Sequence, residues 1–389
     1  MELSKCLEIH RFINIYSLYI EMSKIVTTDA YIWSDVVATS GTPPSARAQH
    51  SAVGWIDPST NTPKMSVFGG TDTGAAGTFY NDVHTLDLVT GNWSGAVAPL
   101  GDPPSARYGH SVVGWIDPST DNPKMSVFGG HDGGGKKNDV HTLDLVTGEW
   151  SGAVVTPGAP TARFGHSAVG WIDLSSNAPK MTVFGGYDGS KKNDVHTFDL
   201  VTGKWSGAVP TSGDPPSARY AHSAVGWIDL SSNAPKMTVF GGDDGNLKND
   251  VHTLDLVTGK WSVAVAPSLH HPPSARRFHS AVGWIDPSTN EPKMSVFGGN
   301  DRSFKNDVHT LDLVTGAWSG AVATSGTPPS ARNGHSAVGW IDPITHSIKM
   351  SVFGGNGGSY YNDTFTLLLM TMTMPSIRRP KGVVLCGKC

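Results

Sequence analysis

The sequence predicts an all-β protein, a six-bladed β-propeller whose blades are four-stranded antiparallel sheets. One phrase recurs six times along the 389-residue chain at intervals of 56 to 60 residues. Each copy has a histidine near its start and carries a Gly-Gly doublet and a tryptophan at fixed places. A repeat of this length with these marks is typical of propeller blades rather than of helical arrays. The histidines are His50, His110, His166, His222, His279 and His335.

Each copy divides into four short strands joined by turns. In the first copy we expect strands at 50–55, at 64–68, at 82–88 and from Trp93 onward. Pro58 presets the backbone of the first turn, and Gly91 allows a positive φ in the last hairpin. Apolar and polar residues do not alternate cleanly in the inner strands, which predicts sheets packed on both faces, as in stacked blades.

Two series account for all twelve tryptophans. Burial of one tryptophan side chain removes about 150–250 Å² from water, which is worth about 4–6 kcal/mol as an upper bound. We therefore expect these side chains to hold neighbouring blades together. The first-strand series is Trp55, Trp115, Trp171, Trp227, Trp284 and Trp340, and the fourth-strand series is Trp33, Trp93, Trp150, Trp205, Trp261 and Trp318.

The sixth copy ends without a fourth-strand tryptophan, and the missing strand occurs near the start of the chain. Trp33 is followed by the same kind of segment that connects the other copies. We expect 31–37 to form the outer strand of the last blade, which closes the ring and removes an open sheet edge. The predicted propeller spans 31–374, between an N-terminal extension, 1–30, expected to be poorly ordered, and a C-terminal tail, 375–389. Its blades are 47–97, 107–154, 163–209, 219–265, 276–322, and 332–370 completed by 31–37.

Composition excludes several classes of partner. Formal net charge is −4 with only 16% charged residues, so no basic surface for nucleic acid is expected. The sequence has no apolar run long enough to insert into a membrane. The cysteines Cys6, Cys386 and Cys389 all lie outside the repeats, and the last two form only half of a zinc site. We expect a cytoplasmic monomer without a cofactor.

These residues resemble the kelch-repeat family, which includes propellers like the central domain of galactose oxidase. The family's marks are the Gly-Gly doublet after the second strand, an aromatic residue in the third and a spaced tryptophan in the fourth. The doublets run from Gly69-Gly70 to Gly354-Gly355, and the resemblance covers about 31–370. It implies a protein-interaction platform. Where the family usually has tyrosine, this chain has His84, His141, His196, His252 and His309, with Phe365 in the sixth copy.

Comparison of the copies with each other locates a predicted binding face. The W-I-D-[PL]-S turn and the D-L-V-T-G-x-W hairpin hardly differ, with only the sixth copy straying. The loop after each doublet and the two residues after each repeated arginine differ strongly. In a four-stranded meander, the two variable segments open on one face of the disc and the two uniform turns on the other. Because binding residues gather on loops carried by a rigid scaffold, we expect the partner on the variable face.

The variable segments carry aromatic, arginine and lysine side chains. Aromatic residues and arginine anchor protein interfaces, so we expect a protein or peptide partner with acidic groups facing the lysines. The long loop of blade one and the loop of blade six are neighbours in the ring, so their four aromatic residues are expected to cluster. The predicted contact residues are Phe79, Tyr80, Tyr108, Phe164, Tyr220, Arg277, Phe278, Asn333, Tyr360, Tyr361, Lys136, Lys137, Lys191, Lys192, Lys248 and Lys305.

One arginine recurs in every copy, and two roles are open to it. A ring of guanidinium groups can bind ligand carboxylates bidentately. Each copy also holds one aspartate in an N-D pair, however, and matched numbers favour internal ion pairs. The arginines are Arg47, Arg107, Arg163, Arg219, Arg276 and Arg332, and the aspartates are Asp82, Asp139, Asp194, Asp250, Asp307 and Asp363.

The residues of the repeats give little support to an enzymatic function. A copper-radical oxidase would need a cysteine linked to tyrosine within the blades, and the blades contain no cysteine. An iron-dependent specifier activity would need carboxylates at the channel mouth, where this chain has residues such as Gln49, Tyr108 and Asn333. No spacing typical of a histidine metal site occurs. We predict a binding module without catalytic or metal-binding residues. The alternative is an architectural scaffold in a cytoskeletal or trafficking assembly.

Overall fold

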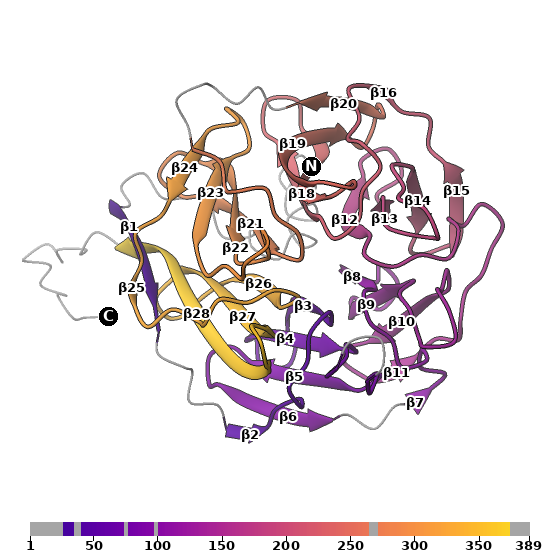
Figure 1. Cartoon of the computed structure of the whole chain (residues 1–389). Coiled ribbons are helices and arrows are strands. Elements are labelled where there is room, and N and C mark those ends of the chain that lie inside the picture. Colours follow the sequence, from indigo (N-terminus) through magenta and orange to yellow (C-terminus); the bar gives the residue numbers. More distant parts are fainter. Residues whose placement is uncertain (1–25, 35–39, 74–76, 97–99, 264–270, 374–389) are drawn as a thin grey trace, which may run out of the picture.

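The computed structural model describes residues 26–34, 40–73, 77–96, 100–263 and 271–373, which form six sheets arranged around a central axis (Figure 1). These residues contain strands and connections and no helix. The predicted six-bladed all-β propeller is therefore confirmed. The three cysteines, and residues 35–37 of the predicted closing strand, lie outside the described residues.

Blades one to three follow the predicted order of strands from the centre outward. Blade one contains β3 (Ser51–Ile56), β4 (Pro63–Phe68), β5 (Val83–Asp87) and β6 (Asn92–Ala96), with β2 (Ser40–Thr42) on its outer edge. Blade two contains β8 (Ser111–Ile116), β9 (Pro123–Phe128), β10 (Val140–Asp144) and β11 (Glu149–Trp150), with β7 (Leu100–Gly101) outside. Blade three contains β12 (Ser167–Asp173), β13 (Ala178–Phe184), β14 (Val195–Asp199) and β15 (Lys204–Ala208).

Blades four to six repeat this arrangement. Blade four contains β17 (Ser223–Asp229), β18 (Ala234–Asp243), β19 (Leu247–Asp255) and β20 (Lys260–Val263), with β16 (Ser212–Gly213) outside. Blade five contains β21 (Ser280–Asp286), β22 (Glu291–Phe297), β23 (Val308–Asp312) and β24 (Trp318–Ala321). Blade six contains β26 (Ser336–Ile341), β27 (Ile348–Asn356), β28 (Tyr360–Thr373) and β1 (Val26–Trp33), with β25 (Ser325–Gly326) outside.

The ring closes between the two ends of the described chain. Strand β1 pairs antiparallel with β28, with Ile32 opposite Leu368 and Trp33 opposite Leu367. Figure 1 shows the indigo β1 beside the yellow β28. The expected closing strand is present, but it begins at Val26 rather than at residue 31, because Val26–Asp29 continue the pairing beyond the repeated pattern.

Four blades gain a fifth short strand that the repeat did not predict. In blade one, β2 pairs parallel with the outer strand β6, with Gly41 opposite Trp93. Gly41 has a φ of +78°, and a Cβ there would collide with the carbonyl oxygen of Trp93. The glycine therefore allows the incoming connection to lie against the edge of the sheet and cover it.

The fourth-strand tryptophans join adjacent blades. The ring of each packs on a phenylalanine in the second strand of the preceding blade, as Trp205 does on Phe128 at 5.0 Å between centroids. Trp33 does the same across the closure, at 5.1 Å from Phe297 of blade five. First-strand tryptophans instead bond within their blade, with the Trp55 indole donating to the Ser66 hydroxyl. The expectation that tryptophans link the blades thus holds for the fourth-strand series.

Candidate functional site

The two variable segments of each blade lie together on one face of the ring. The connection entering a blade pairs with the loop after its Gly doublet, for example through mutual main-chain hydrogen bonds between Tyr108 and His131 of 3.1 and 2.9 Å. The uniform turns meet at the other end of the blade, where the Lys64 ammonium bonds the Asp87 carboxylate at 2.6 Å. We call the first end the variable face and the second the uniform face.

A closed circle of six main-chain hydrogen bonds forms the floor of the variable face. One residue from each connection donates its N–H to the carbonyl of the equivalent residue in the preceding blade, over 2.7 to 2.9 Å. All six have a φ between +55° and +65°. A circle without a free end holds the surrounding side chains at fixed spacing. The members are Gln49, Gly109, Gly165, Ala221, Phe278 and Gly334.

The six repeated histidines lie directly below this circle, buried between blades. The His110 ring packs edge-on to Phe68 of the preceding blade at 5.1 Å, and His222 accepts or donates a bond of 2.8 Å with the Ser167 hydroxyl. Desolvation by burial, reinforced by the neighbouring arginine, lowers the pKa of His222 to about 3. These imidazoles are therefore neutral structural groups at physiological pH.

Seven rings form a continuous arc on this floor, which we call the aromatic crescent. Neighbouring rings lie 5.2 to 6.4 Å apart, from Phe79–Tyr108 at one end to Tyr220–Phe278 at the other. All seven side chains are half-buried, so each keeps part of its surface exposed. Aromatic pairs at such distances stabilise each other. The crescent consists of Phe79, Tyr108, His131, Phe164, Tyr187, Tyr220 and Phe278.

The crescent contains only part of the predicted aromatic set. Phe79 packs toward blade two, and no ring contact among the described residues joins blade one to the tyrosines of blade six. The Tyr80 ring lies under the Arg47 guanidinium at 4.0 Å, and the Tyr361 ring under Arg332 at 4.4 Å. The expected four-residue cluster, which included Tyr360, is thus replaced by two separate arginine–tyrosine stacks. His131 and Tyr187 were missed, although both stand directly after a doublet.

The remainder of the mouth is polar. Asn333 pairs with Asn356 through the main chain, and Asn300 pairs in the same way with Arg277. The Arg277 guanidinium donates to the Tyr220 hydroxyl at 3.0 Å and to the Asp243 carboxylate at 2.9 Å. The mouth therefore has an aromatic side, which runs from blade one to Phe278 at the start of blade five, and an amide-lined side over the rest of blade five and blade six.

Five of the six predicted lysines already have carboxylate partners. Lys137 bonds Asp132 at 2.7 Å, and Lys191 bonds Asp243 at 3.2 Å. Lys192, Lys248 and Lys305 bond Asp188, Asp244 and Asp301 at 2.7 to 2.8 Å. Burial alone would raise the pKa of Asp244, but hydrogen bonds from Lys248 and Ser217 outweigh it and lower the pKa to about 2. Lys136 instead lies 5.5 Å from the centre of the Tyr187 ring.

A protein-family comparison agrees with this architecture. The model described as the KLHDC2/KLHL20/DRC7 Kelch-repeats domain matches residues 18–229 and 174–387. The chain belongs to the kelch-repeat family. Among curated proteins, this kelch chain is similar to Acyl-CoA-binding domain-containing protein 5 of Arabidopsis thaliana, with 28% identity over 85% of the chain and 47% of that protein. It is also similar to human Host cell factor 2, with 29% identity over 68% of the chain and 32% of that protein.

The kelch chain thus spans about half, or less, of the length of the curated relatives it matches. The similarity covers the propeller, so the activities of the complete relatives are not assigned to this chain.

The repeated arginines of the kelch propeller are buried and extensively hydrogen-bonded. All five N–H groups of Arg47 are used, by the Ser45 carbonyl and hydroxyl, the Gly69 carbonyl and both oxygens of Asp82. The Asp82 carboxylate also bonds His84 at 2.9 Å. Each of the six arginines is at most 1% exposed. This geometry supports a structural role, in which the arginine ties the incoming connection to the third strand.

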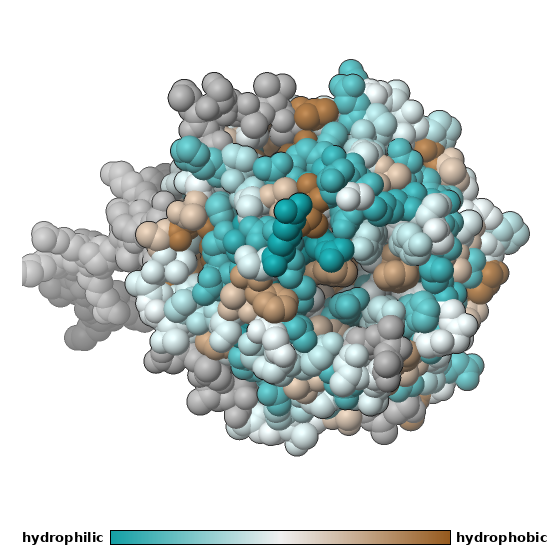
Figure 2. Space-filling model, viewed as in Figure 1, coloured by the Kyte–Doolittle hydropathy of each residue, from teal (hydrophilic) through white to brown (hydrophobic). Residues whose placement is uncertain are grey.

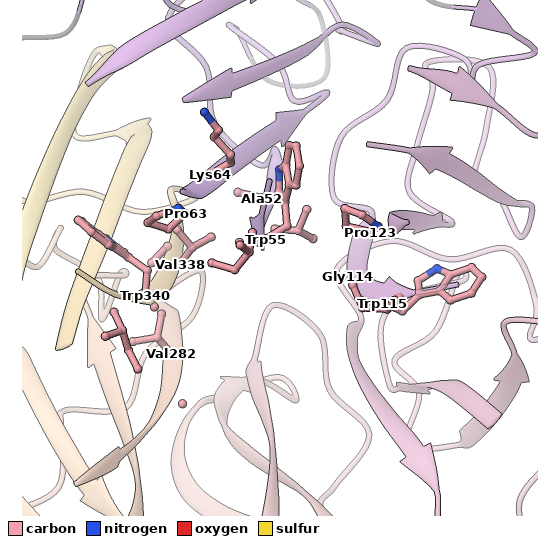
Figure 3. Close-up of a pocket in the computed structure, with 18 of the residues that line it drawn as sticks. Ala52, Trp55, Pro63, Lys64, Gly114, Trp115, Pro123, Val282, Val338 and Trp340 are labelled. Atoms are coloured by element: carbon pink, nitrogen blue, oxygen red, sulfur yellow. The ribbon is translucent and has the colours of Figure 1, made fainter. Parts of the chain in front are cut away.

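A cavity lies in the central channel toward the uniform face. Its volume is about 280 Å³, and the innermost strands of blades one, two, five and six line it. Figure 3 shows Ala52, Val282 and Val338 around this space. Innermost strands of neighbouring blades approach each other closely around the channel, and a Cβ at Gly170 of blade three would lie 3.3 Å from the carbonyl oxygen of Gly114 of blade two. None of the predicted contact residues lines this cavity.

Three further features bear on function: the hydrophobicity of the surface, clusters of metal-binding side chains and membrane-spanning helices. On the face seen in Figure 2, hydrophobic residues form small patches separated by hydrophilic side chains. Within the part of the chain that the structure describes, no group of three or more histidine, cysteine, aspartate or glutamate residues is arranged to hold a metal ion. The same residues contain no helix with the length and hydrophobicity needed to cross a membrane.

Proposed function

We propose that this propeller is a protein-interaction module that holds a peptide segment of its partner on the variable face. The observation that carries the proposal is the aromatic crescent, seven half-buried rings supported by a closed circle of main-chain hydrogen bonds. Rigid aromatic side chains with part of their surface free contribute large contact areas at low entropic cost.

The circle of main-chain hydrogen bonds gives the aromatic rings a rigid support. Tyr108 and Phe164 flank Gly109, whose N–H donates to Gln49 and whose carbonyl accepts from Gly165. The neighbouring rings are therefore positioned before any ligand arrives, so binding requires little reordering of the propeller. Because the mouth has an aromatic side and an amide-lined side, an extended peptide would place an apolar side chain on the first and main-chain groups over the second.

The test uses an array of immobilised octapeptides of random sequence, probed with the purified protein. We expect the wild type to retain a defined set of peptides, and the double variant Tyr108→Ala/Phe164→Ala to lose about tenfold or more of that signal. Leu230→Ser, which changes a 55% exposed side chain on the uniform face, is the matched control and retains the set. Equal thermal midpoints exclude unfolding as the cause. Failure of the wild type to retain any peptide, or unchanged retention by the double variant, contradicts the proposal.

An architectural scaffold is the second candidate, favoured by aliphatic side chains on the uniform turns. Leu230 is 55% exposed, Val257 63% and Ile344 76%. A scaffold that contacts other proteins through these turns would lose them in Leu230→Ser and keep them in the crescent variant. The two functions therefore predict opposite outcomes for the same pair of variants.

We further propose that the protein acts in the cytoplasm as a monomer and does not catalyse a reaction. This view is supported by the absence of cysteine from the repeats, the low net charge and the buried, neutral state of the repeated histidines, four of which bond serine hydroxyls.

A further inference from the structure

Charged groups on the variable face are almost completely matched within the protein. The loop aspartates of blades two to five bond lysines or Arg277, and Asp72 of blade one accepts a bond of 2.9 Å from the Tyr80 hydroxyl. The doublet-loop carboxylates among the described residues thus have internal partners. A ligand carboxylate would have to displace one of them to reach a paired lysine.

Arg302 differs from the paired cations on this face. It lies exposed in the loop of blade five, and no hydrogen bond or ion pair of its guanidinium occurs among the described residues. Its neighbour Lys305 is bonded to Asp301 at 2.8 Å, and Arg277 is bonded to Asp243. The guanidinium of Arg302 therefore has five N–H donors without a partner among the described residues. Their planar, forked arrangement matches the two oxygens of a carboxylate.

The backbone at Arg302 is strained, whereas the other blades avoid this strain. Arg302 has a φ of +97° and is the third residue after its doublet. Blades two, three, four and six place a glycine at that position, with φ values of +82°, +134°, +120° and +109° for Gly133, Gly189, Gly245 and Gly358. The turn is held by the Asn300 side chain, which accepts the Arg302 N–H at 2.8 Å. A side chain in this conformation persists despite a local cost, which is a common mark of functional positions.

The loop places Arg302 at one end of the aromatic crescent. Asn300, two residues earlier, exchanges main-chain hydrogen bonds of 3.0 and 2.9 Å with Arg277. Arg277 precedes Phe278, the last ring of the crescent. The free guanidinium thus belongs to the segment where the aromatic side of the mouth meets the amide-lined side.

We propose that Arg302 binds a carboxylate of the peptide partner while an apolar side chain of the same peptide lies on the crescent. This inference rests on the proposed peptide-binding function and makes it more specific. It assigns recognition of acidic groups to one unpaired arginine on blade five, instead of to the five lysines whose charges are balanced by loop carboxylates.

The experiment uses octapeptides that the wild type retains on the array, synthesised as fluorescent probes in two forms. One form keeps its aspartate and glutamate residues, and the other replaces them with asparagine and glutamine. We expect fluorescence anisotropy to show about tenfold tighter binding of the acidic form by the wild type. Arg302→Gly should reduce this preference to about twofold or less and leave the affinity for the amide form unchanged. Lys305→Gln, which removes a paired cation from the same loop, should keep most of the preference.

Different results test the role of Arg302 and the proposed peptide binding on which that role rests. Peptides retained without any enrichment in acidic residues, or an acid preference that survives in Arg302→Gly, overturn the role of Arg302 and leave peptide binding standing. A wild type that retains no peptide overturns both. An equal or higher thermal midpoint for Arg302→Gly excludes loss of folding as the cause of lost preference.

Discussion

In blade two, the guanidinium of Arg107 and the carboxylate of Asp139 form a two-point hydrogen bond of 2.7 and 3.0 Å. The arginine side chain is 1% exposed and the carboxylate 17%. Arg107 also donates to the carbonyl oxygens of Gly129 and Ser105. One side chain thereby joins the incoming connection, the second strand and the start of the third. The same set of bonds recurs around the ring, so these ion pairs fix the loops that carry the variable face.

Loss of this arginine should destabilise the propeller strongly. Arg107→Gln leaves the Asp139 carboxylate partly buried without its partner, and breaking such a pair costs about 3–5 kcal/mol. We expect a lower urea midpoint, measured by tryptophan fluorescence. Lys204→Gln, at an exposed position on β15, is the control and should leave the midpoint almost unchanged. Equal midpoints for both variants would contradict the structural role of the arginine.

Acid should unfold the protein steeply, because its buried histidines are neutral. Burial lowers the pKa of His50, His110, His222 and His279 to about 3, whereas the same groups in the unfolded chain have a pKa near 6.5. Between these values the unfolded state binds more protons, so the free energy of unfolding falls as the pH drops. Each such histidine contributes about 1.4 kcal/mol per pH unit. Desolvation by burial is outweighed by hydrogen bonds and charge from arginine and histidine, which also lower the pKa of five Arg-paired aspartates, and these act in the same direction below about pH 4. They are Asp82, Asp139, Asp194, Asp250 and Asp307.

Tryptophan fluorescence as a function of pH tests this expectation. The transition should be centred above about pH 4, and His222→Gln should make it shallower. His271→Gln, at an exposed position, should leave its steepness unchanged. A protein that remained folded at about pH 3 would show that the imidazoles do not limit acid stability.

The repeat was sufficient to predict the blades and their closure because it marks every copy in the same way. The doublets, the paired tryptophans and the displaced Trp33 each identify a strand by its position. The parallel edge strands could not be predicted, because they depend on how the connection at Gly41 meets a neighbouring strand distant in sequence.

The candidate site was predicted only in part, for a similar reason. The aromatic residues that come into contact depend on which two segments of the chain pair. Tyr108 and His131, for example, pair although they are 23 residues apart. Tyr80 and Tyr361 point to the buried arginines because they occupy the loop position that lysine holds in the other blades. The lysine–aspartate pairs, in contrast, follow a visible spacing, as between Asp188 and Lys192, and sequence reasoning could have found them.

Arg302→Gly should not destabilise the protein, although it removes a large side chain. Relief of the positive φ contributes about 1 kcal/mol in favour of the folded state, partly offset by the greater freedom of glycine in the unfolded chain. We expect an unchanged or slightly higher urea midpoint. The reciprocal variant Gly189→Ala introduces a side chain at a φ of +134° where a Cβ would meet nothing within 4 Å, so any loss there reports backbone strain alone. A clear fall in midpoint for Arg302→Gly would show that the side chain itself stabilises the loop.

Trp33 should control both the stability of the ring and its closure. Its ring packs on Phe297 of blade five and on Phe365 of blade six, and it is 2% exposed. Trp33→Ala should lower the free energy of unfolding by about 3–5 kcal/mol. Strand β1 is far in sequence from the rest of blade six and is held there by its pairing with β28 and β25. Release of β1 would therefore also expose the edge of β28. Trp205→Ala removes the equivalent side chain from β15, a strand that follows β14 directly in the chain and therefore stays tied to its own blade. We expect both variants to lose stability, but only Trp33→Ala to self-associate in light scattering. Self-association of both, or of neither, would contradict the closure role of β1.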